Sequence, residues 1–173
     1  MIKITKQWTE FEDIYVLIKS VGAPDKSIRL SCFRHLMYYK GILYNTNGKV
    51  IAFREFDLPG VESNCFIEVI SCTKSQIILA PLSDDWDCGQ MIDLLYLPLP
   101  TDAGAKGDAI EGDPNYVFCE MCRQMPADRS LNISFFLNFA KNFDIITSYI
   151  DVENKRAVVT GGRVTFVQMF MRG

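Results

Sequence analysis

The sequence predicts an α+β protein in which one structural unit, a helix followed by an antiparallel meander, occurs twice. Two stretches carry apolar residues at helical spacing, short apolar runs joined by turn dipeptides follow each stretch, and a Pro/Gly-rich segment separates the two. With 173 residues, 49% of them hydrophobic, the chain is long enough for one well-buried core. We therefore expect a single domain over 1–173, with a first half at 1–81 and a second half at 129–173.

The first half opens with a predicted helix over Thr9–Val21. Thr9 is a suitable N-cap, and Glu12 follows at the spacing of a capping box. The strands predicted after it are Ile28–Phe33, Leu36–Tyr44, Val50–Phe56, Cys65–Cys72 and Gln76–Ala80. Asn47-Gly48 marks a hairpin turn, because both residue types tolerate positive φ.

Residues 82–128 are predicted to form a connection, part of it mobile. The middle of this segment is rich in Gly, Asp and Ala, and prolines stand at positions 98, 100 and 114. Within it, Met91–Leu97 is the candidate for an isolated strand.

The second half repeats the opening pattern. A wide apolar stripe from Leu131 to Phe143 predicts a mostly buried helix, and three strands follow it. These strands are Ile145–Val152, Arg156–Thr160 and Arg163–Met171, with turns at Glu153-Asn154 and Gly161-Gly162. If the two units close on each other, the helices lie side by side in a two-layer domain. The first helix then buries Ile14, Leu17 and Ile18 against Phe136, Leu137 and Phe139.

Composition favours a soluble, cytoplasmic protein. No apolar run approaches the ~18–20 residues that cross a bilayer, and the first ten residues lack the apolar core of a secretion signal. The 18 Lys and Arg against 21 Asp and Glu give a net charge of -3, which argues against a protein that coats nucleic acid by overall charge. A local basic face remains open.

The C-terminal sequence resembles that of the bacterial-type DNA sliding clamp, the DNA polymerase III beta subunit family. The last domain of that family ends in an apolar strand and a Met-Pro-Met-Arg tail. Here Met169, Met171 and Arg172 match the tail, and Phe170 replaces the proline. Upstream, Leu131–Leu137 is similar to the Asn-x-x-(Tyr/Phe)-Leu run that opens the family's last helix.

A second similarity lies in the first half. The Ile42–Phe56 hairpin is similar to the strands that precede the family's Asp-Gly-His-Arg-Leu motif, although Phe53–Asp57 stands in place of that motif. The resemblance implies a DNA-clamp-like fold of two helix-plus-meander units. Because a full clamp chain has three such domains and this chain has room for one, a ring would require several copies, and we expect a possible homo-oligomer.

The resemblance also implies a peptide-binding site in the tail. By position it falls on Met169, Phe170, Met171 and Arg172, where flexible Met side chains suit varied partners and Arg can bind a carboxylate or carbonyl. The alternative is a final strand whose alternate residues fill the core.

A clamp also needs cations toward DNA, because phosphates are held by Lys and Arg. The candidate nucleic-acid-binding residues are Lys3, Lys6, Lys26 and Arg29, if they share one face, and a solvated surface is the alternative. Neither predicted helix offers many cations: the first carries Glu10, Glu12 and Asp13 against Lys19.

No pattern argues for catalysis. The Cys119-x-x-Cys122 pair offers half of a zinc site that Cys72 or Cys88 would complete, but with no further pair or nearby His, free thiols are the alternative that we adopt. His35, the single histidine, has no nucleophile motif around it, and Asp84, Asp85 and Asp87 lack the spacing of a calcium loop. We expect no enzyme activity, no catalytic residues, no metal and no cofactor.

Two hypotheses for the function remain. The first is a non-enzymatic clamp-like replication accessory or processivity factor of a phage or mobile element, which self-associates and binds DNA or a polymerase partner. The second is a protein- or peptide-binding module of the same fold without DNA binding.

Overall fold

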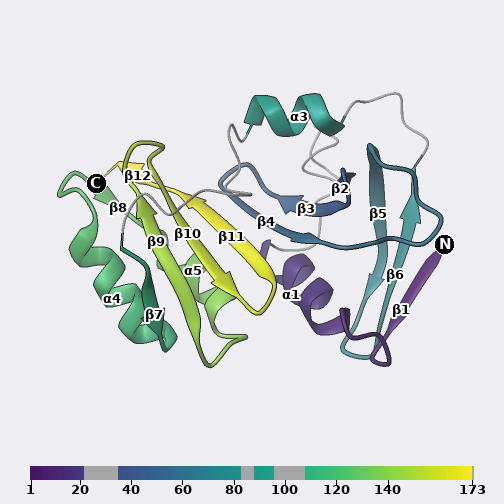
Figure 1. Ribbon diagram of the computed structural model, residues 1–173, viewed down its shortest axis with the longest axis horizontal. Coiled ribbons are helices and arrows are strands. Elements are labelled where there is room, and N and C mark those ends of the chain that lie inside the picture. Colours follow the sequence, from purple (N-terminus) through teal and green to yellow (C-terminus); the bar gives the residue numbers. More distant parts are fainter. Residues whose placement is uncertain (22–34, 83–87, 96–107, 173) are drawn as a thin grey trace.

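The computed structural model describes residues 1–21, 35–82, 88–95 and 108–172, and ten of its strands form one antiparallel sheet (Figure 1). The order across the sheet is β1-β6-β5-β2-β3-β4-β11-β10-β9-β7. These strands are β1 (Ile2–Thr5), β2 (Leu36–Tyr39), β3 (Ile42–Thr46), β4 (Val50–Glu55), β5 (Cys65–Cys72), β6 (Gln76–Pro81), β7 (Ile110–Gly112), β9 (Ile146–Asp151), β10 (Arg156–Gly161) and β11 (Val164–Met169).

Four helices and a two-stranded ribbon complete the described chain. The helices are α1 (Phe11–Val21), α3 (Cys88–Leu95), α4 (Pro114–Gln124) and α5 (Ile133–Ala140), and the ribbon pairs β8 (Arg129–Ser130) with β12 (Met171–Arg172). Among the described residues, no helix is long and apolar enough to cross a membrane.

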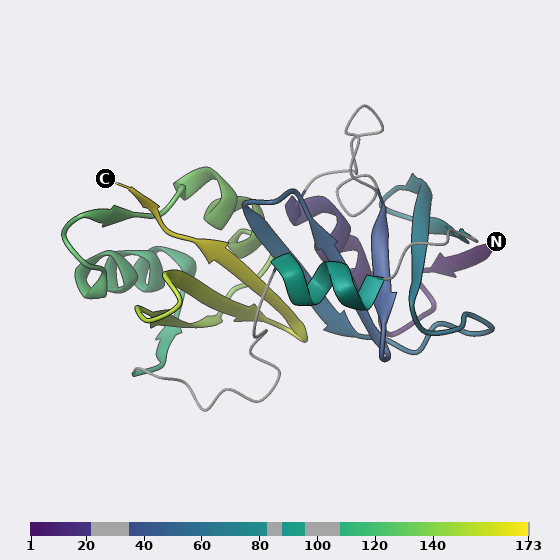
Figure 2. The same ribbon diagram turned by 90° about the horizontal axis from the view of Figure 1, so that it is seen from above.

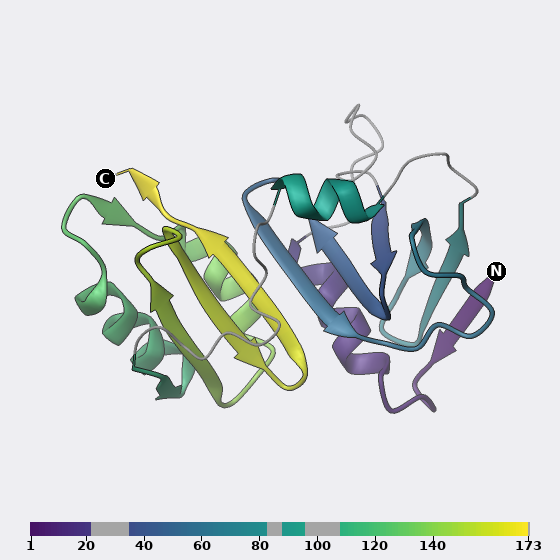
Figure 3. The same ribbon diagram turned by 45° about the horizontal axis from the view of Figure 1, so that its top comes forward.

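The predicted duplication is present in the topology. Helix α1 precedes the meander β2-β3-β4, and helix α5 precedes the meander β9-β10-β11. The two meanders join through their last strands, because β4 pairs antiparallel with β11 from Val50–Gln168 to Phe53–Thr165 (Figure 3). The expected α+β class, with two helix-plus-antiparallel-meander units, is therefore confirmed.

The main core lies between this sheet and three helices. Helices α1 and α5 pack against each other, as expected, and α4 packs on β7 and β9. Ile14, Leu17 and Ile18 are buried, and across from them Phe139 stacks on Phe166 of β11 with ring centroids 4.9 Å apart. The expectation for Leu137 was wrong: its side chain is 40% exposed, because it projects from the opposite side of α5.

A second apolar cluster covers the other face of the sheet. Helix α3 packs against β2 on this face, opposite α1 (Figure 2), and buries Cys88 and Ile92 with Met37 and Phe66. The strand predicted at Met91–Leu97 is therefore wrong, because buried residues four apart suit a helix turn. The segment 82–128, expected as a connection, also holds β7 and α4.

Local differences concern where elements begin and end. The carbonyl of Glu10 accepts the first helical hydrogen bond from Ile14 N at 3.0 Å, so Glu10, and not the predicted Thr9, occupies the N-cap position. The strand predicted at Leu36–Tyr44 is two strands, because Lys40 and Gly41 adopt φ of 50° and 74° in a tight turn. The strand expected at Ile28–Phe33 lies outside the described residues.

The hairpin turn at Asn47-Gly48 is confirmed, whereas the turn predicted at Gly161-Gly162 lies one residue later, at Gly162-Arg163, because Gly161 still pairs with Val164. Gly48 and Gly162 have φ of 86° and 56°, and Asn47 Oδ1 accepts hydrogen bonds from the amides of Lys49 and Val50.

Candidate peptide-binding site

The four predicted tail residues follow the last long strand at one end of the sheet. Strand β11 ends at Met169, Phe170 interrupts the pairing, and Met171 and Arg172 then pair with Ser130 and Arg129. Met169 and Met171 are 43% and 41% exposed, and Phe170 is half-buried against the core. The tail therefore alternates as a final strand does, with Phe170 packed on the core and Met169 and Met171 facing solvent, where they are available to a ligand.

Three of the four tail residues line a pocket of about 250 Å³, called here the tail pocket. Its lining residues are Gly48, Lys49, Asn132, Phe135, Gln168, Met169, Phe170 and Met171. Arg172 is exposed and does not belong to this lining. Phe135, Gln168 and the β3–β4 turn were not predicted as site residues.

Hydrogen bonds from three segments fix the tail pocket. Phe170 N donates to Lys155 O at 2.8 Å, and Met169 N donates to Lys49 O at 3.3 Å. Buried Gln168 donates from Nε2 to Asn132 O at 3.1 Å. Asn132 is the N-cap of α5, where its Oδ1 accepts from the amides of Ser134 and Phe135. The backbone of the site is therefore held in place, while its methionine side chains remain adaptable.

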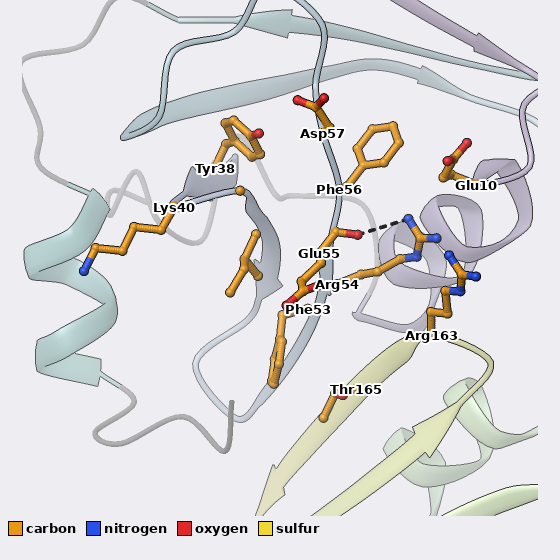
Figure 4. Close-up of a pocket in the computed structure, with 12 residues that line it drawn as sticks. Glu10, Tyr38, Lys40, Phe53, Arg54, Glu55, Phe56, Asp57, Arg163 and Thr165 are labelled. Atoms are coloured by element: carbon orange, nitrogen blue, oxygen red, sulfur yellow. Dashed lines mark hydrogen bonds between the residues drawn. The ribbon is translucent and has the colours of Figure 1, made fainter. Parts of the chain in front are cut away.

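A second, larger pocket of about 790 Å³ was not predicted, and we call it the arginine pocket (Figure 4). It lies at the opposite end of the β4–β11 pair from the tail pocket. Its lining residues are Glu10, Tyr38, Lys40, Gly41, Ile42, Phe53, Arg54, Glu55, Phe56, Asp57, Arg163 and Thr165. The available signal was Arg54, a charged residue among the apolar residues of a predicted strand.

The side chain of Arg54 is only 5% exposed in this pocket, and three contacts hold it in place. Its Nε lies 2.9 Å from Asp13 Oδ2, its Nη1 donates to Glu55 O at 3.1 Å, and its guanidinium lies over the ring of Phe56 at 5.9 Å. Arg163 extends from the β10–β11 turn toward the same place, and both arginine side chains line the pocket (Figure 4). Backbone and Thr9 hydrogen bonds lower the pKa of Glu10, and the Arg54 and Arg163 charges add to this effect.

The predicted DNA contacts are placed only in part. Lys3 and Lys6 are exposed, on and just after edge strand β1, whereas Lys26 and Arg29 lie outside the described residues. Along the exposed sides of α1 and α5 the cations are Lys19 and Lys141. These helices therefore present little positive charge.

The cysteines do not gather into a metal site in the described part of the chain. Cys119 and Cys122 are exposed on α4, Cys72 is half-buried on β5, and Cys88 is buried at the start of α3. No group of three or more potential His, Cys, Asp or Glu ligands occurs among the described residues. His35 is half-buried next to Phe66, and Asp84, Asp85 and Asp87 lie outside these residues.

Comparison with known proteins connects this fold to bacterial sliding clamps. No protein-family model and no curated protein sequence matches the chain. Among solved structures, the DNA polymerase III beta subunit of Borrelia burgdorferi matches with a TM-score of 0.60 and 10% identity over 98% of this chain. The sliding clamp of Pseudomonas aeruginosa matches with a TM-score of 0.53 and 12% identity over 99% of it.

A third similar structure is the Helicobacter pylori beta clamp bound to a DNA ligase peptide, with a TM-score of 0.56 and 9% identity over 99% of this chain. The matches cover 63% of the Borrelia chain and 66% of each of the other two. At these identities, the comparison shows that the chain has the sliding-clamp fold.

Proposed function

We propose that this clamp-fold chain is a non-enzymatic replication accessory protein that captures a short peptide segment of a partner in its tail pocket. One observation carries the proposal: residues suggested by a short C-terminal resemblance, Met169–Met171, line a pocket between α5 and a hairpin turn. The complex of the Helicobacter pylori beta clamp with a DNA ligase peptide supports the same kind of ligand.

The chemistry of the pocket suits side chains of a peptide. Its volume of about 250 Å³ is below the ~300–1,000 Å³ typical of sites for whole small molecules. Met169, Met171 and Phe135 offer apolar surface, and Lys49 lies at its edge. We therefore expect one or two apolar side chains of an extended segment to enter it.

The proposal is tested with peptides selected on the protein from a random dodecapeptide library. The double variant Met169→Ala/Met171→Ala should weaken their binding at least about tenfold, because apolar contacts are lost. Ile70→Ala, which removes an equally exposed apolar side chain from β5, is the matched control and should change nothing. Added salt should have little effect. Selected peptides that bind the double variant as well as the original protein would contradict the site.

A second candidate function, a ring that encloses DNA, is favoured by the ends of the sheet. Strands β1 and β7 terminate the strand order, and backbone groups at a sheet edge can pair with those of another copy. Light scattering should then show an oligomer, and the protein should be retained on closed circular DNA more than on linear DNA. A strict monomer with equal retention on both would exclude the ring. The low positive charge of α1 and α5 makes us rank this second.

A further inference from the structure

The two pockets are equivalent by the internal duplication. Each lies where the last strand of a meander ends, beside the start of the helix of its own unit and beside a hairpin turn of the other unit. The equivalent pairs, first half then second, are Glu10 and Asn132, Gly48 and Gly162, Lys49 and Arg163, Ala52 and Phe166, Arg54 and Gln168, and Phe56 and Phe170. Ala52 and Phe166 are directly paired at the join of β4 and β11 and share the inner core.

The chemistry of the two pockets differs at these equivalent positions. Where neutral Gln168 bonds to the start of α5, Arg54 forms an ion pair with Asp13 in α1. At the positions equivalent to Met169 and Met171 of the tail pocket, the arginine pocket has Glu55, the last residue of β4, and Asp57, two residues later. The same backbone arrangement therefore presents an apolar surface at one end of the join and a charged one at the other.

Two guanidinium groups converge in the arginine pocket. The contacts of Arg54 use Nε and Nη1, and within the described residues no hydrogen bond involves its Nη2. Arg163 forms no hydrogen bond or ion pair with the described residues. The turn that carries it is close to α1, since a Cβ at Gly162 would lie 3.1 Å from Asp13 Oδ1. A carboxylate fits such a pair, because a guanidinium binds it through two parallel hydrogen bonds.

We propose that the arginine pocket is a second peptide-binding site, which takes an extended segment through one Asp or Glu side chain bound by Arg54 and Arg163. In the lining, half-buried Ile42 and Thr165 provide a surface for an apolar neighbour of that residue. Glu55 and Asp57 restrict the ligand, because further negative charges along it would meet these carboxylates. For the same reason a DNA strand, with a negative charge at each phosphate, is disfavoured here.

This inference concerns residues outside the tail pocket, and it rests on the proposed function only for the idea that the fold binds peptides. Burial and ion pairing of Arg54 mean that one of the two guanidiniums is already oriented, so less freedom is lost on binding. The exposed Arg163 then completes the site, and its removal leaves the buried pair of Arg54 and Asp13 intact.

The test uses ¹⁵N-labelled full chain and two synthetic peptides, acetyl-Ala-Phe-Glu-Leu-Ala-Lys-amide and the same peptide with Gln in place of Glu. The Glu peptide should shift the amide resonances of Gly161, Gly162 and Arg163 and bind about tenfold more tightly than the Gln peptide. Arg163→Gln should remove this preference, and Arg163→Lys should retain part of it. Lys74→Gln, which removes an exposed cation from the β5–β6 turn, is the matched control and should leave the preference unchanged.

Other outcomes would overturn the assignment. Equal binding of the two peptides, or no shifts at millimolar peptide, would show that no carboxylate site exists. Shifts of the same amides by a single-stranded oligothymidylate, without a response to the Glu peptide, would assign the pocket to phosphate. The variant Met169→Ala/Met171→Ala separates the two proposals, because it should leave binding of the Glu peptide unchanged even where peptides selected on the tail pocket are lost.

Discussion

The two ends of the β4–β11 join show how one backbone arrangement serves two chemistries. At one end, a buried Gln168 and exposed methionines form the tail pocket, and at the other, a buried Arg54 and exposed carboxylates form the arginine pocket. The helices beneath are alike, since α1 and α5 each bury an apolar face at the common core. The duplicated core therefore maintains the fold, while side chains at the pocket rims set what each end can bind.

The largest expected effect tests whether the halves share one core. Phe139→Ala should lower the free energy of unfolding by about 3–5 kcal/mol, because it removes a fully buried ring stacked on Phe166. Leu17→Ala, at the corresponding place in α1, should cost about 2–5 kcal/mol. Urea unfolding followed by circular dichroism should show one transition in both variants. Two separate transitions would mean that the halves are independent.

The next largest effect is expected at the Arg54–Asp13 ion pair of the arginine pocket. Asp13→Asn should lower the free energy of unfolding by about 2–3 kcal/mol, because Arg54 keeps its buried charge without its partner. The loss is smaller than for a fully buried pair, because Asp13 is 20% exposed. The double variant Asp13→Asn/Arg54→Gln should recover part of this loss, since it imitates the neutral Gln168 end. Urea is the suitable denaturant, because it does not screen charge. A double variant less stable than Asp13→Asn would contradict the equivalence of the two ends.

A smaller effect is expected from pH at a buried carboxylate of the second half, Asp151. Burial by itself raises the pKa of Asp151, but hydrogen bonds from Asn154 and Arg156 outweigh it, so the pKa is lowered on folding. A lowered pKa gives stability that is present above the unfolded pKa, near 3.8, and lost as the pH falls through the folded pKa.

This pH effect can be measured by urea unfolding between pH 6 and pH 2. The original protein should lose more stability than Asp151→Asn over this range. Parallel profiles for the two proteins would show that the Asp151 carboxylate does not contribute in this way.

The smallest expected change in stability comes from removing either of two buried hydroxyl groups, one in each half. Within the described residues, Ser20 Oγ in α1 and Ser148 Oγ in β9 are buried without a hydrogen-bond partner. Ser148→Ala should raise stability by up to about 1 kcal/mol, because an unsatisfied polar group leaves the core. Ser20→Ala should gain slightly more, because Ala also favours the helix. Thermal unfolding would check both, and a loss of stability in either variant would reveal a hydrogen bond.

Sequence reasoning succeeded where a residue has one dominant local role. Gly48 and Gly162 mark turns that require positive φ, and the apolar periodicity around Leu17 and Phe139 indicates the buried helix faces. It failed for α3, since a short apolar run has no clear period, and a helix over Cys88–Leu95 is decided by the sheet face that it covers.

Of the two pockets, only the tail pocket could be suggested from the sequence. Met169, Phe170 and Met171 could be suggested from a tail resemblance, because the residues are contiguous in the chain. The arginine pocket could not, because Arg54 and Arg163 come together only when β4 and β11 pair. No local pattern in either segment indicates that pairing.

The attachment of the tail to α5 has a consequence for dynamics. Gln168 holds Asn132, whose side chain caps the amides of Ser134 and Phe135, and β12 pairs with the strand that immediately precedes this helix. We therefore expect opening of β12 and fraying of the first turn of α5 to be coupled. A molecule seated against the methionines would slow hydrogen exchange at both amides, so that occupancy of the tail becomes visible at the start of a helix.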